Sequence, residues 1–178
     1  PSDISRQKPT TGSQIKIGRL VQEFTLTDNN AVDQLTAMLS NAWRVALFLG
    51  KGCGSAIDEI MIFSDLTHAP IVAGPAGKRW INGYHRRFRG VYGFAGHQSA
   101  IDTMDDDGID LLIAVGTPIT EIGTAGWHSN LLNDRLVHID STVEHFSRTP
   151  MAKHHVCGDL QSIFQQLNQN IKQGLKWG

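Results

Sequence analysis

The feature that most restricts the fold of this chain is the alternation of short, uninterrupted apolar runs with amphipathic segments. Residues 45–49 (VALFL) and 111–115 (LLIAV) lack the polar residue at every second position that a half-exposed strand carries. Residues 31–39 and 160–172 instead space their apolar side chains three or four positions apart, as a helix with one buried face does. Strands buried on both faces, alternating with helices, predict a parallel sheet with right-handed crossovers.

The same patterns give the approximate bounds of each element. Strands are expected at 44–50, 70–74, 90–93, 110–116, 135–140 and 154–159, and helices at about 31–39, 55–66, 98–104 and 160–172. Asn29 or Asn30 would cap the first helix and Ser55 the second. The predicted fold class is α/β: a doubly wound, Rossmann-like parallel sheet of about six strands with helices on both faces, of the DHS-like type that binds NAD or FAD. Residues 1–18 have no periodicity and are interpreted as a linker before one domain at 19–178.

Composition excludes several classes of protein. The chain has 16 Lys and Arg against 17 Asp and Glu, a balance that argues against a general binder of nucleic acid or of membrane surfaces. No apolar run approaches the roughly 20 residues that span a bilayer, and the N-terminus lacks the apolar stretch of a signal peptide, so we expect a cytoplasmic protein. Cys53 and Cys157 lie far apart in sequence, which favours two buried, reduced thiols over a disulfide framework or a zinc site.

Glycine or aspartate follows nearly every predicted strand. Ligands of open parallel sheets bind beyond the carboxyl ends of the strands, and glycine there lets the backbone approach a ligand closely. Turns of this fold favour glycine without any ligand too, so both interpretations stay open. The residues expected to line a cofactor site are Gly50, Lys51, Gly52, Gly74, Gly93, Gly96, Gly116, Thr117, Asp140, Ser141 and Asp159.

Several of these residues have a specific expected role. The amides of Gly50, Lys51 and Gly52 would contact the phosphates of a nucleotide, because unpaired amides at a helix start attract anions. Asp140 would take a ribose or an adenine edge. A bulky residue at Gly52 would then abolish binding while leaving the fold. For Asp159 we favour a role as the cap of the last helix over contact with a ligand.

Known catalytic motifs are missing from the sequence. The turn at 50–56 (GKGCGSA) has Ser55 where a dinucleotide fingerprint needs its third glycine, and no acidic residue follows the second strand to hold a ribose, which argues against an NAD-dependent dehydrogenase. There is no G-x-S-x-G and no H-E-x-x-H. The acidic run at 105–107 is interpreted as a solvated turn, and no metal ligands are predicted.

The segment from Lys78 to Gly90 stands out in a nearly neutral chain, with five basic and three aromatic residues in thirteen positions. It could hold the phosphates of a nucleotide or of coenzyme A, or meet an acidic partner surface. An ordinary solvated connection is the third interpretation.

Taken in order, the motifs resemble the central domain of thiamine-diphosphate-dependent enzymes, the group of acetolactate synthase and pyruvate decarboxylase. The resemblance extends from about residue 30 to residue 167. The similar segments within it are 41–52 (NAWRVALFLGKG), 69–72 (APIV), 90–97 (GVYGFAGH), 110–116 (DLLIAVG), 137–140 (VHID) and 156–160 (VCGDL). The opening residues 1–3 resemble the end of the family's preceding pyrimidine-binding domain. Since they also lack an initiator Met, we expect the chain to be a piece of a longer protein.

The resemblance implies a scaffold domain of a 2-keto-acid decarboxylase or carboligase. In this family the flanking pyrimidine- and diphosphate-binding domains hold thiamine diphosphate and Mg²⁺ across a subunit interface, so the piece alone is not expected to catalyse, and the parent is expected to be a homodimer or homotetramer. Some central domains bind FAD or ADP, and others are empty. The turn at 116–122 lacks the arginines of FAD-binding synthases, whereas Lys51 resembles the lysine of ADP-binding oxalyl-CoA decarboxylases.

A second hypothesis comes from a different class of protein. The same fold would serve a free-standing nucleotide-binding or electron-transfer subunit, which a start codon immediately before Pro1 and a stop codon after Gly178 would indicate. A sirtuin-like deacylase shares the fold class but usually carries a zinc module of four cysteines, which two cysteines do not supply.

Overall fold

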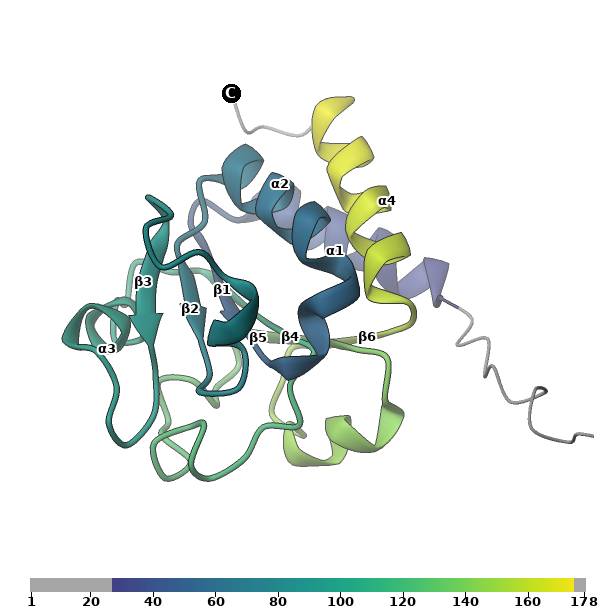
Figure 1. Cartoon of the computed structure of the whole chain (residues 1–178). Coiled ribbons are helices and arrows are strands. Elements are labelled where there is room, and N and C mark those ends of the chain that lie inside the picture. The colour runs from purple at the N-terminus through teal and green to yellow at the C-terminus, as the bar shows by residue number, and fades with distance from the viewer. Residues whose placement is uncertain (1–26, 175–178) are drawn as a thin grey trace, which may run out of the picture.

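A computed structural model describes residues 27–174, so the predicted linker at 1–18 lies outside the described residues. Six parallel strands form one sheet in the order β3-β2-β1-β4-β5-β6. Figure 1 shows helices on both sides of this sheet. The strands are β1 (Val45–Leu49), β2 (Ile71–Ala73), β3 (Phe88–Val91), β4 (Leu111–Val115), β5 (Leu136–Asp140) and β6 (His154–Cys157). This is the doubly wound arrangement that the sequence predicts, and the α/β fold class is confirmed.

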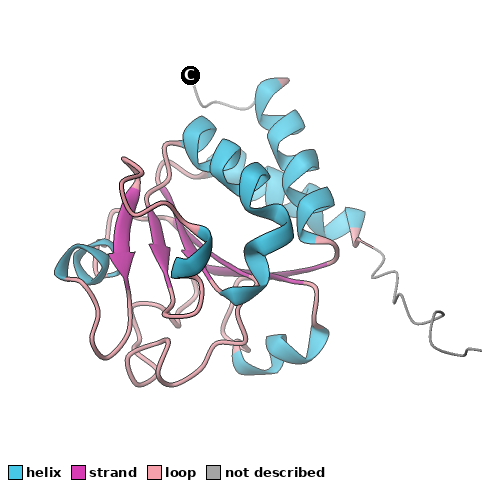
Figure 2. Cartoon of the chain, viewed as in Figure 1, coloured by secondary structure: helices cyan, strands magenta, loops and turns pink. Residues whose placement is uncertain are grey.

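The apolar runs are uninterrupted because both faces of the sheet are covered. In β1, Val45, Leu47 and Leu49 belong to the core on one face of the sheet. Ala46 and Phe48 belong to the core on the other face. The first face is covered by α1 (Asn29–Asn41), α2 (Ile57–Thr67) and α4 (Leu160–Lys172), and the second carries α3 (Gln98–Met104), so the helices are distributed unevenly (Figure 2).

A long loop takes the place of a helix on the second face. Residues 117–135 connect β4 to β5 through turns, with no helix in this part of the structure. Ile119 and Leu131 of this loop are fully buried and join the apolar core of that face. The loop therefore starts at the carboxyl end of β4 and continues over the sheet.

Several element boundaries differ from the sequence prediction, and three of these differences have a clear physical reason. Helix α1 is capped by Asp28, whose side chain accepts a hydrogen bond from the Ala31 amide at 3.0 Å, so the prediction of an asparagine cap is wrong. Ser55 does not cap α2, because it lies inside a short 3-10 helix, η1 (Lys51–Ala56), that precedes α2. Strand β3 ends two residues earlier than predicted, since its pairing with β2 ends at Val91 and Gly93 turns away with φ of 138°.

Both cysteines are free thiols. Cys53 is buried and donates a hydrogen bond to the Val115 carbonyl at 3.1 Å, and burial raises its pKa to about 12. Cys157 is only half-buried, so the prediction of two buried thiols holds for Cys53 alone. Within residues 27–174, none of the helices has both the length and the apolar character that crossing a membrane requires.

Asp159 caps α4, the role that the sequence favours. Its Oδ2 atom accepts hydrogen bonds from the amide and the hydroxyl of Ser162, at 2.8 and 2.7 Å. We expect Asp159→Ala to lower the free energy of unfolding by about 1 kcal/mol, because two donors at the helix start lose their acceptor. Urea unfolding measures the change. Asp159→Asn keeps an acceptor and should lose less; equal losses for the two variants would contradict this role.

Candidate functional site

A crevice of ≈ 210 Å³ lies beside the carboxyl ends of β1, β2 and β4. The order of the strands reverses between β1 and β4, and ligands of doubly wound sheets bind at this reversal. The residues that line the crevice are Phe48, Gly50, Lys51, Gly74, Pro75, Ala76, Gly77, Thr117, Pro118, Ile119, Thr120, Gly123 and Thr124. Its position is the one in which the sequence places a cofactor site.

The predicted site residues divide into two groups. Gly50, Lys51, Gly74 and Thr117 line the crevice. The residues outside its lining are Gly52, Gly93, Gly96, Gly116, Asp140, Ser141 and Asp159. The lining residues that sequence reasoning did not assign come mainly from 75–77 and 118–124, where a proline beside small residues was the available signal.

The glycine turn after β1 packs directly against the end of β4. A Cβ atom on Gly50 would lie 2.4 Å from the Gly116 carbonyl oxygen, and one on Gly52 would lie 3.0 Å from the same atom. The Gly50 amide donates to the Val115 carbonyl at 2.9 Å, and the Gly52 amide to the Gly116 carbonyl at 2.8 Å. Close backbone packing therefore explains both glycines without a ligand.

These contacts change two expectations drawn from the sequence. The amides of Gly50 and Gly52 already have carbonyl acceptors, so their predicted contact with phosphates is not favoured by the structure. A Cβ atom at Gly52 would lie only 3.0 Å from the Gly116 carbonyl oxygen, so the close packing does not favour the expectation that a bulky variant keeps its fold, which stays a prediction. Lys51, between the two glycines, keeps its place in the crevice wall.

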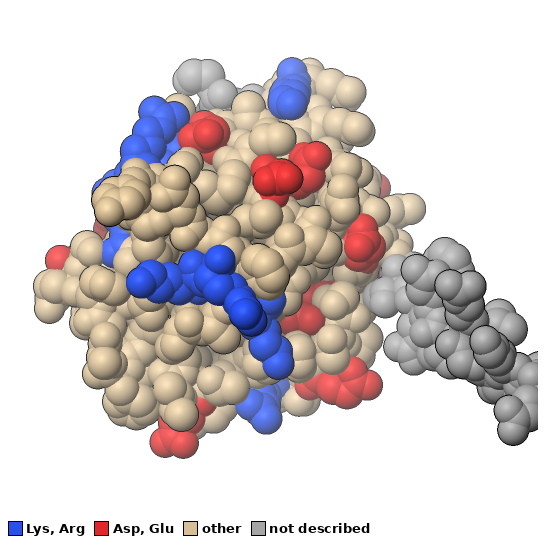
Figure 3. Space-filling model, viewed as in Figure 1, with Lys and Arg blue, Asp and Glu red and all other residues tan. Residues whose placement is uncertain are grey.

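The basic segment at 78–90 is divided between two ends of the molecule. Lys78 and Arg79 belong to a short 3-10 helix, η2 (Lys78–Trp80), where the Trp80 indole donates to the Lys51 carbonyl at 2.8 Å. Figure 3 shows Lys and Arg side chains in a row across this part of the face. Arg86 and Arg87, in contrast, each pair with Asp65 at 3.1 Å. Only the η2 half therefore adds positive charge near the crevice.

Asp140 ends β5 inside a polar cluster. Its carboxylate accepts hydrogen bonds from His145 Nδ1 and from the Thr142 amide, each at 2.9 Å, and His138 Nε2 lies 3.7 Å away. Burial alone would raise the pKa of Asp140, but these three polar contacts outweigh burial, so its pKa is lowered. The predicted contact of Asp140 with a ribose or adenine stays a prediction that these partners do not favour.

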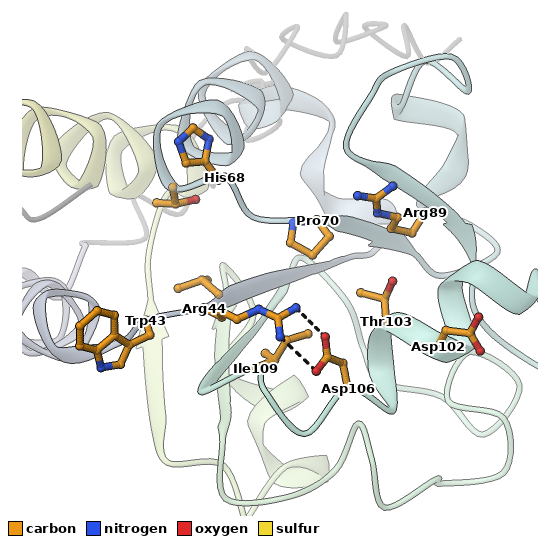
Figure 4. A pocket seen from close by; sticks show the side chains of 11 residues that line it. Trp43, Arg44, His68, Pro70, Arg89, Asp102, Thr103, Asp106 and Ile109 are labelled. Atoms are coloured by element: carbon orange, nitrogen blue, oxygen red, sulfur yellow. Dashed lines mark hydrogen bonds and ion pairs between the residues drawn. The ribbon is translucent and has the colours of Figure 1, made fainter. Parts of the chain in front are cut away.

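A larger cavity of ≈ 570 Å³ lies at the opposite, amino-terminal edge of the sheet (Figure 4). Arg44 and Asp106 face each other there, joined by two hydrogen bonds of 2.5 and 3.2 Å. The hydrogen bonds from Arg44, followed by one from the Gly108 amide, lower the pKa of Asp106. The acidic run at 105–107 thus forms a turn, as predicted, with one ion pair. Because ligands of open parallel sheets bind at the other edge, the crevice is the candidate site.

Comparison with known proteins finds a matching family model and several relatives. Residues 32–167 match a family model described as "Thiamine pyrophosphate enzyme, central domain". The chain is 24% identical over 149 residues to a "probable sulfoacetaldehyde acetyltransferase" of Rhizobium meliloti, covering 79% of this chain and 24% of that protein. It is 23% identical over 182 residues to chloroplastic acetolactate synthase 2 of Nicotiana tabacum, covering 97% and 26%.

A solved structure agrees in fold. The X-ray structure of an enzyme from Mycobacterium smegmatis, described as thiamin diphosphate-dependent, superposes with a TM-score of 0.61 at 19% identity, covering 86% of this chain and 30% of that one. The chain thus spans less than a third of each of these proteins. Because the family model covers most of the chain, the chain belongs to the family of thiamine pyrophosphate enzyme central domains.

Proposed function

We propose that this domain is the scaffold of a thiamine-diphosphate-dependent enzyme that decarboxylates 2-keto acids, with or without carboligation, and that its crevice binds ADP. The position of the crevice at the reversal of strand order, with Lys51 in its wall, is the observation that carries the nucleotide part of the proposal. Membership of the family and the similarity to acetolactate synthases support the parent activity.

ADP is favoured over FAD by the chemistry of the crevice wall. The loop at 117–124 contains no arginine to pair with a flavin nucleotide. The crevice of ≈ 210 Å³ is also smaller than the roughly 300–1,000 Å³ of typical ligand pockets, so it suits one end of a mononucleotide better than a dinucleotide. Lys51, with Lys78 and Arg79 of neighbouring η2, supplies positive charge for a diphosphate.

Thiamine diphosphate and Mg²⁺ belong, in this proposal, to the flanking pyrimidine- and diphosphate-binding domains of the parent chain. Within residues 27–174 no three His, Cys, Asp or Glu side chains gather in a way that could hold a metal ion. In this proposal the residues described here take part in no chemical step at either cofactor. We further propose that the parent is a cytoplasmic homodimer or homotetramer.

Removing the charge of Lys51 tests the crevice. We expect Lys51→Met to weaken ADP binding about tenfold. A charge-assisted hydrogen bond contributes roughly 1.5–3 kcal/mol, and in the variant a water molecule compensates for part of this loss by solvating the phosphate. Isothermal titration calorimetry measures the affinity. Lys153→Met removes a lysine beside β6, near the amino ends of the strands, and is the matched control. Equal ADP affinity in wild type and Lys51→Met would contradict the assignment.

A further inference from the structure

The loop that follows β4 (residues 116–135) forms one wall of the crevice, and several of its residues have a left-handed backbone conformation. Gly116, Ile119, Ala125, Gly126 and Trp127 all have positive φ, between 47° and 82°. For a β-branched residue such as Ile119 this conformation is a genuine outlier, and it persists only where surrounding contacts hold the backbone in place. Ile119 is also fully buried and lines the crevice, so the strained residue is part of the candidate site.

The first contact that fixes the loop comes from β5. His138 is fully buried, and its Nε2 atom lies 3.0 Å from the Thr117 carbonyl oxygen. A carbonyl only accepts, so this nitrogen carries a proton and donates it. The Nδ1 atom of the same ring lies 3.0 Å from the Thr149 hydroxyl, so both ring nitrogens have partners.

A second contact comes from η3 (Val143–Arg148), the short 3-10 helix after β5. Arg148 Nη1 donates to the Ile119 carbonyl at 3.2 Å. The carbonyls of Thr117 and Ile119 thus have donors on the β5–η3 side of the loop. Two side chains, His138 and Arg148, therefore hold the two carbonyls that flank Pro118 in the crevice wall.

The orientation of His138 is itself fixed by its neighbours. The Phe146 ring packs edge-on against the His138 ring, with ring centroids 5.0 Å apart. His155 Nε2 lies 3.0 Å from both the carbonyl and the hydroxyl oxygen of Thr149. Because the carbonyl accepts, His155 donates at this position. The single hydroxyl proton of Thr149 then has two acceptors within reach, His138 Nδ1 at 3.0 Å and the Phe146 carbonyl at 3.3 Å, and His138 Nδ1 is the nearer one.

We propose that His138 and Arg148 form a clamp that sets the shape of the crevice for its ligand. They are positioning residues: neither lines the crevice, and each acts through a backbone carbonyl of the loop. The clamp holds Ile119 in its strained conformation before the ligand arrives, so binding does not have to order the loop. This inference deepens the proposed function and rests on it for the identity of the ligand.

Arg148→Met is the decisive variant, because Arg148 is exposed and its loss should leave the core intact. We expect ADP affinity to fall about tenfold, and amide hydrogen exchange in peptides covering 117–127 to become faster, while the midpoint of unfolding stays unchanged. Arg148→Lys keeps a donor and should restore much of the affinity. Arg86→Met removes an exposed arginine paired with Asp65 and is the matched control.

His138 gives an independent arm of the same test. His138→Gln can keep a donor to the Thr117 carbonyl and should bind ADP better than His138→Leu, which keeps none. Calorimetry measures ADP affinity and hydrogen exchange measures the order of the loop. The two together distinguish a failure of the proposed function from a failure of the clamp. If the wild type binds no ADP, the nucleotide part of the proposed function fails, and hydrogen exchange in 117–127 still decides whether the clamp orders the loop. Unchanged loop exchange in Arg148→Met, or unchanged affinity where the wild type binds, would overturn the clamp.

Discussion

Gly50→Ala is expected to lower the free energy of unfolding by about 3 kcal/mol, at the upper end of the range for overpacked sites. The added Cβ atom would lie 2.4 Å from the Gly116 carbonyl oxygen and equally close to the Thr117 Cβ atom. Neither neighbour can move aside cheaply, because one is backbone and the other belongs to the clamped loop. Relief requires β1 and β4 to separate at their carboxyl ends, where the crevice lies.

Urea unfolding followed by circular dichroism measures this loss. Gly83→Ala is the matched control, because a Cβ atom at Gly83 meets nothing within 4 Å. We expect the control to stay within about 0.5 kcal/mol of the wild type. If Gly50→Ala is as stable as Gly83→Ala, the close packing of the two turns is not what requires glycine, and contact with a ligand becomes the better explanation.

Phe164→Ala is expected to cost about 4 kcal/mol, as for other large core aromatics replaced by alanine. Phe164 of α4 is fully buried, and its ring meets the Phe63 ring of α2 edge to face, with centroids 5.4 Å apart. Truncation removes the contact between two helices that cover the same face of the sheet, and it leaves a cavity there.

A double-mutant cycle with Phe63→Ala checks the origin of that loss. We expect a coupling free energy of about 1 kcal/mol between the two rings, since aromatic pairs contribute beyond the area they bury. Phe94→Ala, at a ring that is 69% exposed, serves as the control and should change stability little. Independent effects of Phe63→Ala and Phe164→Ala would contradict the packing described here.

The fold was predictable because its determinants are local. The runs 45–49 and 111–115 are apolar throughout, and this is possible only for strands covered on both sides. The spacing of apolar residues in 160–172 predicts α4 with its buried face, and Asp159 marks its start. Element boundaries that depend on tertiary contacts were less predictable. The end of β3 is an example, because it is set by the last residue that pairs with β2.

The candidate site was predictable in position but only partly in detail. A glycine directly after a predicted strand marks the carboxyl end of that strand, so Gly50 and Gly74 indicated the crevice. The wall formed by 117–124 could not be read from the sequence, because its shape depends on contacts with distant residues. His138 and Arg148 reach that loop through backbone carbonyls, which leave no sequence signature.

The most direct test of a nucleotide site in the crevice is an equilibrium titration of the purified chain with ADP, with FAD titrated in parallel. We expect saturable binding of ADP at one site per chain, and weaker or no binding of FAD. The same preparation, denatured and examined by mass spectrometry beforehand, shows whether a nucleotide already fills the crevice. A protein that carries no nucleotide and binds neither ADP nor FAD would contradict a nucleotide site at the β1–β4 crevice and leave the domain a structural scaffold.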